Sequence, residues 1–241
     1  MKISVVIPAF NEERLLGDSL REVRRAMAAF VERGWATELI VCDNNSTDRT
    51  AEIARAAGAQ VVFEPVNQIA RARNAGAAAA TGDWLVFVDA DSHPSRELFN
   101  DVAAEMVRGH CLAGGSTVRM ETSKWVGRMG AGLWNRVSRL RRLMAGSFIF
   151  VEAAAFREVG GFSHELFAGE ELDLSLKLRA VGKRTGRHIV ILHRHPLLTS
   201  ARKLHLYRQR ELLGFFLKAA FAPRRVMRSR EDCHPWYDGR R

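Results

Sequence analysis

Short apolar runs alternate with longer amphipathic stretches over the N-terminal part of the chain. The runs are Lys2–Pro8, Glu38–Asp43, Ala59–Phe63 and Asp83–Asp89. Each has the length of a strand, and its apolar residues follow one another without the regular polar alternation of a half-exposed strand. This pattern is typical of strands that lie buried within a parallel sheet.

The stretches between these runs predict helices. Glu12–Arg33 carries apolar residues three or four positions apart, which places them on one helical face: Leu15, Leu16, Leu20, Val23, Met27 and Phe30. Residues 46–58 begin with a capping serine and end on a glycine, and an alanine-rich stretch ends at Thr81–Gly82. Strands that alternate with helices predict an α/β fold with a doubly wound, mostly parallel sheet, whose ligands lie at the carboxyl ends of the strands.

Acidic residues follow three of the predicted strands. The sequences are P-A-F-N-E-E (8–13), C-D-N-N-S-T-D (42–48) and D-A-D (89–91). Any one of them fits an ordinary polar turn, but three at the same edge of a sheet indicate a site. Clustered carboxylates repel one another unless a cation lies between them, and Mg²⁺ and Mn²⁺ prefer oxygen ligands. Asp89 and Asp91 point the same way in an extended segment, so both can serve one ligand, through a metal ion and a sugar hydroxyl.

Charge and cysteine content narrow the class of protein. Residues 1–100 hold 11 basic and 14 acidic residues, whereas residues 101–241 hold 26 and 13, so the basic character belongs to the second half. A basic half predicts an anionic partner. Three widely spaced cysteines argue against a disulfide framework. The apolar N-terminus is too short for a signal peptide, and no run approaches the roughly 20 residues of a membrane span. We therefore expect a cytoplasmic location.

Taken in order, six motifs resemble the family 2 glycosyltransferases of the GT-A fold. They are V-V-I-P-A-F-N-E-E (5–13), I-V-C-D-N-N-S-T-D-R-T (40–50), A-R-N-A-G (72–76), V-F-V-D-A-D (86–91), V-G-G-F (159–162) and G-E-E-L-D-L-S-L-K-L-R-A-V-G (169–182). The resemblance implies a GT-A domain over 1–200, with a nucleotide-sugar half (1–109) and an acceptor half (110–200). Residues 201–241 would then form a basic amphipathic extension.

The resemblance also implies roles for individual residues. The nucleotide and its sugar would be held by Pro8, Ala9, Phe10, Glu12, Asp43, Arg73, Asn74 and Asp89. Asp91 would bind Mn²⁺ or Mg²⁺, with Asp89 beside it and with His193 or His195 completing the metal shell. The acidic pair Glu170–Glu171 would lie on the acceptor side, with Glu171 as the general base. The helix dipole would lower the pKa of Glu171, whereas burial or Glu170 would raise it, and the sequence leaves this choice open.

Two departures from the family pattern stand out. Asn44 follows Asp43 where a second aspartate is common, and Glu171 stands where aspartate is usual. The Q-x-x-R-W motif of processive synthases is missing from the sequence. The resemblance therefore implies a single, inverting transfer from a nucleotide sugar, typically a UDP-sugar, to an acceptor hydroxyl.

Other classes of protein fit the sequence less well. Nucleotidyltransferases and Rossmann oxidoreductases need a glycine-rich loop after the first strand, where P-A-F-N-E-E stands here. We expect no nucleic-acid partner, because the basic half contains no recognised binding motif and the acidic strand ends would repel phosphate without a metal ion. A non-catalytic nucleotide- or polyanion-binding protein with the same fold stays open as the alternative.

The basic half contains a second feature, an amphipathic segment at 124–144. Its apolar residues have helical spacing: Val126, Met129, Leu133, Val137, Leu140 and Met144. Residues 119–142 hold seven basic residues and one acidic residue. Two interpretations stand. The helix lies on the anionic inner face of the cell membrane, where a lipid-linked acceptor would be found, or its apolar stripe packs on the domain. The apolar and then basic stretch 212–225 offers a second membrane contact.

Overall fold

The computed structural model describes residues 1–122, 125–200, 218, 223–233 and 237. Its strands are β1 (Lys2–Ala9), β2 (Ala36–Asp43), β3 (Gln60–Phe63), β4 (Trp84–Val88), β5 (Ser92–His93), β6 (Cys111–Glu121), β7 (Phe148–Glu152) and β8 (His188–Ser200). Its helices are α1 (Leu16–Val31), α2 (Thr50–Ala56), α3 (Ile69–Ala79), α4 (Arg96–Arg108), α5 (Trp125–Arg141), α6 (Ala153–Glu158), α7 (Glu170–Thr185) and α10 (Pro223–Met227).

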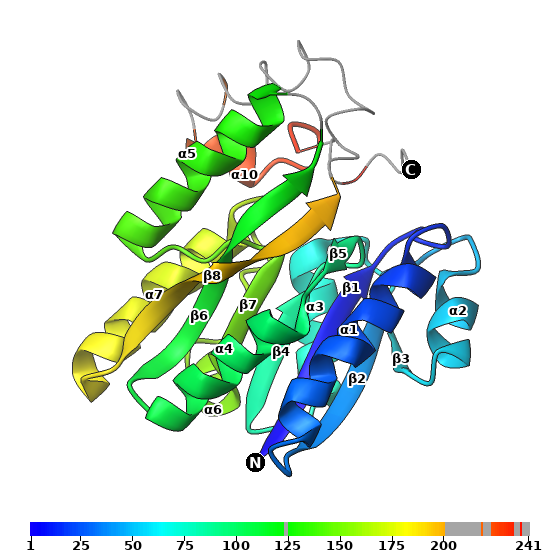
Figure 1. The fold of residues 1–241 in the computed structure, drawn as a ribbon. Helices are drawn as coiled ribbons and strands as arrows, with labels where there is room; N and C mark the ends of the chain where they lie inside the picture. Colours follow the sequence, from blue (N-terminus) through cyan, green and yellow to red (C-terminus); the bar gives the residue numbers. More distant parts are fainter. Residues whose placement is uncertain (123–124, 201–217, 219–222, 234–236, 238–241) are drawn as a thin grey trace.

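One mixed sheet runs through the molecule in the order β3-β2-β1-β4-β7-β6-β8-β5 (Figure 1). The pairs β1–β2, β1–β4, β2–β3 and β6–β8 are parallel, whereas β4–β7, β6–β7 and β5–β8 are antiparallel. The predicted α/β fold with a mostly parallel sheet is confirmed. Because β7 returns antiparallel between β4 and β6, the two halves of the chain share one continuous sheet.

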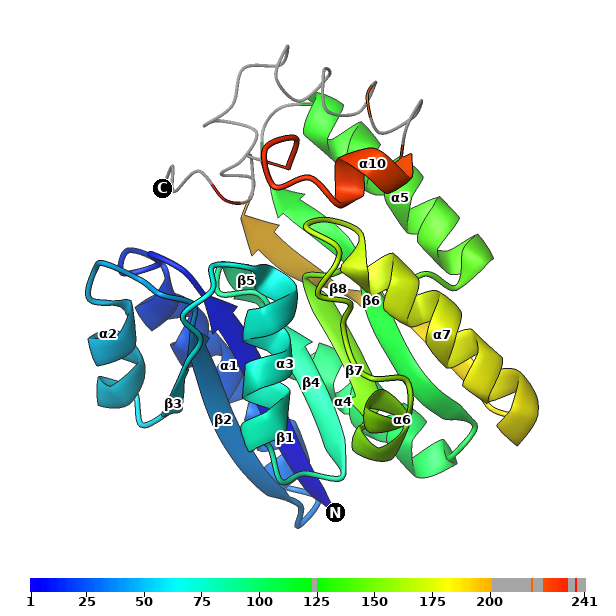
Figure 2. The ribbon, with the colours of Figure 1, turned by 180° about the vertical axis from the view of Figure 1, so that it is seen from behind.

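Helices cover both faces of this sheet (Figures 1 and 2). Helices α1 and α4 lie on one face, and α3, α6 and α7 lie on the other. All five residues of β4 are buried, and successive side chains of a strand point to opposite faces. Val86 and Val88 accordingly join the core under α1 and α4, whereas Leu85 and Phe87 join the core under α3 and α7. The uninterrupted apolar run follows from this burial on both faces.

Helix α1 keeps its predicted apolar face but begins later than expected. Leu16, Leu20, Val23, Met27 and Phe30 are buried, as the spacing predicted. Residues 12–15 form a turn instead of the first helical turn, in which the carbonyl of Glu12 accepts hydrogen bonds from the backbone N–H groups of both Leu15 and Leu16. The N–H of Glu12 is bound elsewhere, by Thr50 at the start of α2.

The second half of the chain continues the sheet and adds the basic helix. Strand β8 runs from His188 to Ser200 beside β6. The amphipathic segment predicted at 124–144 forms α5. Most of the predicted extension at 201–241, including most of the stretch 212–225, lies outside the described residues. Within the part of the chain that the structure describes, no helix is long and apolar enough to cross a membrane.

Candidate active site

The carboxyl ends of β1 and β2 are joined by hydrogen bonds. Ala9 lies opposite Asp43 in the parallel register, and the N–H of Asn44 donates to the carbonyl of Ala9 at 2.8 Å. The N–H of Glu12 donates to Thr50 Oγ1 at 2.8 Å. Ala9, Glu12 and Asp43 are buried, with Pro8 inside β1 and Phe10 half-buried at its end. The structure therefore brings together the residues that the sequence assigned to the base and ribose.

Asn44 explains the first departure from the family pattern. Its Nδ2 donates to the carbonyls of Glu64 and Val66, at 3.2 and 2.7 Å, and its Oδ1 accepts from the N–H of Gln68 at 2.9 Å. An aspartate has no donor with which to satisfy the two carbonyls. The asparagine therefore fixes the loop between β3 and α3, and through it the start of the helix that carries Arg73.

A buried arginine, Arg73, connects the end of β4 with the start of α7. Arg73 is 1% exposed, and its Nη1 donates to Glu170 Oε1 at 2.7 Å. Its Nη2 donates to Asp89 Oδ1 at 2.9 Å and to the carbonyl of Gly146 at 2.8 Å, and its Cζ lies 5.2 Å from the ring centroid of Phe162. One planar group thus holds the carboxylate that follows β4 and the carboxylate that starts α7. These contacts are with protein groups, so Arg73 has the position of a residue that orients the site.

Asn74 connects α3 to the V-G-G-F segment. Its Nδ2 donates to the carbonyl of Phe162 at 2.8 Å, and its Oδ1 accepts from the N–H of Phe162 at 3.0 Å. Gly161 permits this approach, because a Cβ atom there would lie 2.6 Å from Asn74 Oδ1, and because its φ of +68° favours glycine. The amide of Asn74 is therefore engaged with the acceptor half, although the sequence assigned it to the nucleotide.

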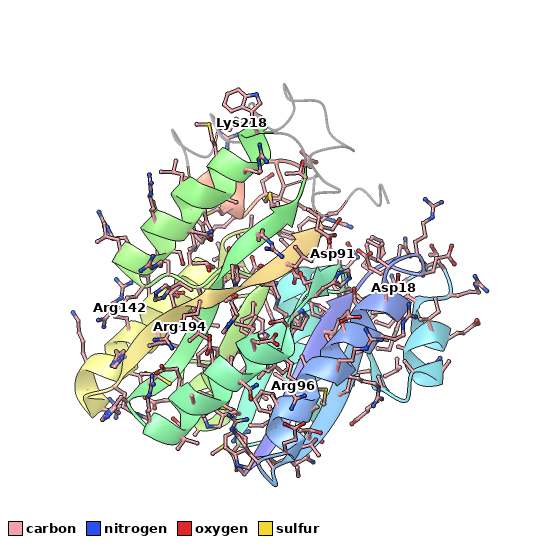
Figure 3. The ribbon with its side chains drawn as sticks, in the orientation of Figure 1. Asp18, Asp91, Arg96, Arg142, Arg194 and Lys218 are labelled. Carbon is pink, nitrogen blue, oxygen red and sulfur yellow. The ribbon has the colours of Figure 1, made fainter. Side chains whose placement is uncertain are left out.

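These contacts surround a cavity of about 190 Å³. Its walls come from α3, the end of β4, the loop before β7 and the loop into α7, and they include Arg73, Asp89, Ser147, Phe167, Glu170 and Glu171. Donor-side and acceptor-side candidates thus line the same cavity. Asp91 lies two residues after Asp89, directly before β5 (Figure 3).

The two acidic residues that start α7 have different environments. Glu170 is buried and paired with Arg73, whereas Glu171 is half-buried and lines the cavity. Burial and then the neighbouring Glu170 raise the pKa of Glu171 to about 8, against the opposing effect of Arg73. The choice that the sequence left open is thus decided in favour of a raised pKa, which is the property of a carboxylate that can take up a proton near neutral pH.

The raised pKa predicts that stability depends on pH through Glu171. The folded state favours the protonated form of Glu171. The stability that this protonation contributes is present at low pH and is lost as the pH rises from about 4.5 to about 8. We expect the variant Glu171→Gln to melt roughly 5 °C above the wild type at about pH 9, and at the same temperature at about pH 5. Melting curves across this range test the prediction, and a pH-independent difference would contradict it.

Asp89 and Asp91 have the chemistry of a site for Mg²⁺ or Mn²⁺. Such ions use one or two protein carboxylates and take their other ligands from phosphate and water. Both aspartates are partly exposed at the end of β4, so their oxygens fit a cation that a diphosphate helps to hold. Among the described residues, no group of three or more His, Cys, Asp and Glu side chains could hold a metal ion by itself.

The two histidines are not placed with these aspartates. Nδ1 of His195 lies 2.9 Å from Asp101 Oδ2, on α4, and His193 is exposed. His195 lines a larger cavity of about 620 Å³ beside α1, whose walls include neither Asp89 nor Asp91. The structure pairs His195 with α4 instead of with Asp91, and a place for His193 or His195 in a metal shell stays a prediction.

Sequence reasoning missed two C-terminal residues that hold Phe167 in the wall of the cavity. The N–H of Phe167 donates to the carbonyl of Met227 at 2.6 Å, and the hydroxyl of Tyr237 donates to the carbonyl of Phe167 at 2.9 Å. These contacts hold the loop that leads into Glu170 and Glu171. Aromatic residues in a basic C-terminal stretch gave no signal for this position.

Comparisons with known proteins agree with this arrangement. Residues 4–157 match the family described as Glycosyl transferase family 2. An uncharacterized glycosyltransferase of Mycobacterium tuberculosis is 35% identical over 130 residues, which cover 53% of this chain and 55% of that protein. The undecaprenyl-phosphate 4-deoxy-4-formamido-L-arabinose transferase of Pseudomonas aeruginosa is 33% identical over 135 residues, which cover 51% and 38%. The matched regions thus span about half or less of these relatives.

Solved structures show the same fold. A mannosyltransferase from Pyrobaculum calidifontis, in complex with GDP-Man and Mn²⁺, has a TM-score of 0.68 at 18% identity, over 94% of this chain and 61% of that one. Glucosyl-3-phosphoglycerate synthase from M. tuberculosis, in complex with Mn²⁺, UDP and phosphoglyceric acid, has a TM-score of 0.62 at 22% identity, over 96% and 78%. The fold is therefore of the GT-A type, and with the family match over residues 4–157 it follows that this chain is a member of glycosyl transferase family 2.

Proposed function

We propose that this protein transfers a sugar from a nucleotide-sugar donor to an acceptor hydroxyl, in a single, metal-dependent and inverting step. The observation that carries the proposal is the bridge made by Arg73, which fixes Asp89 and Glu170 at 2.9 and 2.7 Å from one guanidinium group. A donor-side carboxylate and the acidic pair of the acceptor side are thereby held at one cavity, as a transfer between two bound substrates requires.

The donor site would be formed by the ends of β1, β2 and β4. Asp43 and the segment from Pro8 to Glu12 would border the nucleoside, and Asp89 and Asp91 would hold Mg²⁺ or Mn²⁺ at the diphosphate. A bound cation there would offset the negative charge of the leaving diphosphate. UDP is the nucleotide we favour, supported by its presence in complexes of two structural relatives, TarS of S. aureus and the synthase of M. tuberculosis.

Glu171 would act as the general base. The acceptor oxygen forms a bond to the anomeric carbon while the bond from this carbon to the diphosphate breaks, and the nucleoside diphosphate leaves with the electron pair. The proton of the acceptor hydroxyl passes to the carboxylate of Glu171. Attack from the face opposite the leaving group inverts the anomeric carbon. Glu170, neutralised by Arg73, would keep the N-terminus of α7 in place.

A lipid-linked acceptor is the class we favour, with the reacting hydroxyl on the group that the lipid carries. The relative from P. aeruginosa is named as a transferase for undecaprenyl phosphate, which is a lipid carrier. The loops before β7 and into α7 form part of the wall of the cavity beside Glu171, and they belong to the basic part of the chain. An anionic lipid carrier complements that charge.

Ligand-dependent stability tests the donor site. We expect UDP to raise the melting temperature in the presence of Mn²⁺, by roughly 5–10 °C at a hundredfold excess over its Kd, and to have little effect with a chelator. Asp91→Ala should abolish the shift. Asp18→Ala, which changes an exposed aspartate paired with Arg21 on α1, should leave it intact.

Each outcome of this test has a definite meaning. A shift with GDP in place of UDP would change the donor and keep the chemistry. A shift that does not depend on Mn²⁺, or one that survives in Asp91→Ala, would refute the metal role of the aspartate. Manganese-dependent binding together with no consumption of any nucleotide sugar would favour the non-catalytic binding protein.

A further inference from the structure

Helix α5 contacts the rest of the protein through small residues and through Trp134, which is half-buried against Val118 and Ala131. Gly127, Ala131 and Ser138 are buried, and Ala131 packs with Val118 of β6. The amide of Asn135 accepts from the N–H of Val118 and donates to its carbonyl, both at 2.9 Å. The side of the helix that faces the sheet is therefore narrow, and its position is fixed by hydrogen bonds as well as by packing.

Five other large apolar residues of α5 point the other way. Trp125, Met129, Leu133 and Leu140 are 64%, 63%, 65% and 82% exposed, and Val137 is 39% exposed. Residues three or four positions apart share a helical face, so these five side chains form one continuous stripe, which we call the α5 stripe. Of the predicted stripe, Met129, Leu133, Val137 and Leu140 are exposed in the described structure, whereas Met144 is buried in the core under α7. Packing on the domain therefore holds for Met144 and not for these four residues.

Arginines accompany the α5 stripe, and acidic residues are missing from this part of the sequence. No aspartate or glutamate occurs between Glu121 and Glu152, whereas six lysines and arginines do. Arg128, Arg136, Arg139, Arg141 and Arg142 are exposed, and Figure 3 shows Arg142 at the end of α5 that leads back to the cavity. In both views of the fold, α5 lies at the periphery of the molecule (Figures 1 and 2).

The α5 stripe lies a short distance along the chain from the cavity. Residues 142–147 lead from α5 to Gly146, which binds Arg73, and to Ser147, which lines the cavity. The N–H of Met144 donates to Ser175 Oγ at 3.1 Å, and this hydroxyl donates to the carbonyl of Glu171 at 2.7 Å. The position of α5 is thus linked directly to the helix that carries Glu171.

We propose that α5 docks this protein on an anionic lipid bilayer. The α5 stripe enters the headgroup region, and the flanking arginines contact lipid phosphates, which is the arrangement of helices that lie in a membrane interface. A second copy of the chain fits this surface poorly, because a symmetric contact would bring two arginine-rich faces together. A nucleic acid would match the arginines but leave the apolar side chains without a partner. The proposal does not depend on the sugar transfer.

Vesicle flotation with the full chain tests the proposal. The wild type should float with vesicles that contain phosphatidylglycerol and stay behind with vesicles of phosphatidylcholine alone. Leu133→Asp and Met129→Asp should each weaken binding by about tenfold or more. Each removes an apolar side chain that would be buried in the bilayer and adds a negative charge that the anionic lipids repel. Arg136→Gln with Arg139→Gln should weaken binding by about 25-fold at low salt.

Val107→Asp is the matched control, because Val107 is 68% exposed on α4, away from α5. It should bind vesicles like the wild type, and melting curves should show all variants folded, since every altered side chain is exposed. Three results would overturn the proposal: no binding of the wild type to anionic vesicles, an equal loss in Val107→Asp, or a concentration-dependent dimer that Leu133→Asp dissolves while vesicle binding is absent. Because flotation requires no donor, failure here leaves the proposed transfer untouched.

Discussion

Replacing Arg73 with methionine is expected to destabilise the protein by about 3–5 kcal/mol, which corresponds to a fall of roughly 10 °C in melting temperature. The cause is the carboxylate of Glu170, which is buried and 2.7 Å from Nη1 of Arg73. Without the guanidinium, this carboxylate must take up a proton or lie uncompensated in the core. Denaturant unfolding at neutral pH gives the free energy of unfolding for comparison.

A double-mutant cycle separates this effect from lost packing. We expect Arg73→Met combined with Glu170→Gln to recover part of the stability, because the second change removes the charge that the first one strands. The single variant Arg73→Lys should stay less stable than this double variant. One ammonium group cannot reproduce the contacts of Arg73 with both Glu170 and Asp89. Strictly additive losses would show that the ion pair is not the source of the effect.

Replacing Glu171 with glutamine is expected to lower kcat by a factor of about 10²–10⁴, with little change in the KM for the donor. Glutamine keeps the size of the side chain and cannot accept the proton of the acceptor hydroxyl. The wild-type rate should rise with pH toward a plateau above about pH 8, where Glu171 is ionised. Steady-state kinetics with the donor identified by the binding experiment provide the measurement.

Asp173 offers the control for this variant. It lies in the same first turn of α7, half-buried, and is paired with Lys177 at 2.8 Å. Asp173→Asn removes one negative charge from the turn and should leave kcat within about threefold of the wild type. A comparable loss of kcat in both variants would mean that the net charge of the turn, and not a general base, determines the rate. A Glu171→Gln enzyme with full activity would exclude Glu171 from proton transfer.

The order of strands and helices could be predicted over the first ninety residues. Strands that are buried on both faces of the sheet appear in the sequence as continuous apolar runs. Strand β4 is apolar at all five positions, and α1 repeats its apolar residues at helical spacing. The turn at Glu12 was missed, since it depends on a hydrogen bond to Thr50, 38 residues away. Local patterns contain no information about such a partner.

The sequence allowed many residues of the candidate site to be named, but it did not allow their contacts to be predicted. Arg71 and Arg73 stand two apart in an alanine-rich stretch, yet Arg71 is half-buried and bonded to Gln68 whereas Arg73 is enclosed. Nothing in the local sequence distinguishes the two, because the enclosure comes from Asp89, Gly146 and Glu170. The partner of His195 could not be predicted for the same reason, since Asp101 comes from α4.

The bridge at Arg73 also bears on how the chain folds. Its contacts come from α3, the end of β4, the loop before β7 and the start of α7, so a buried charge is compensated only when both halves of the chain are assembled. A fragment that ended near residue 109 would contain the arginine and Asp89 without Glu170, and it would expose the edge of β4 that β7 covers. The parts of the chain before and after residue 109 are therefore expected to gain their stability as a single cooperative unit.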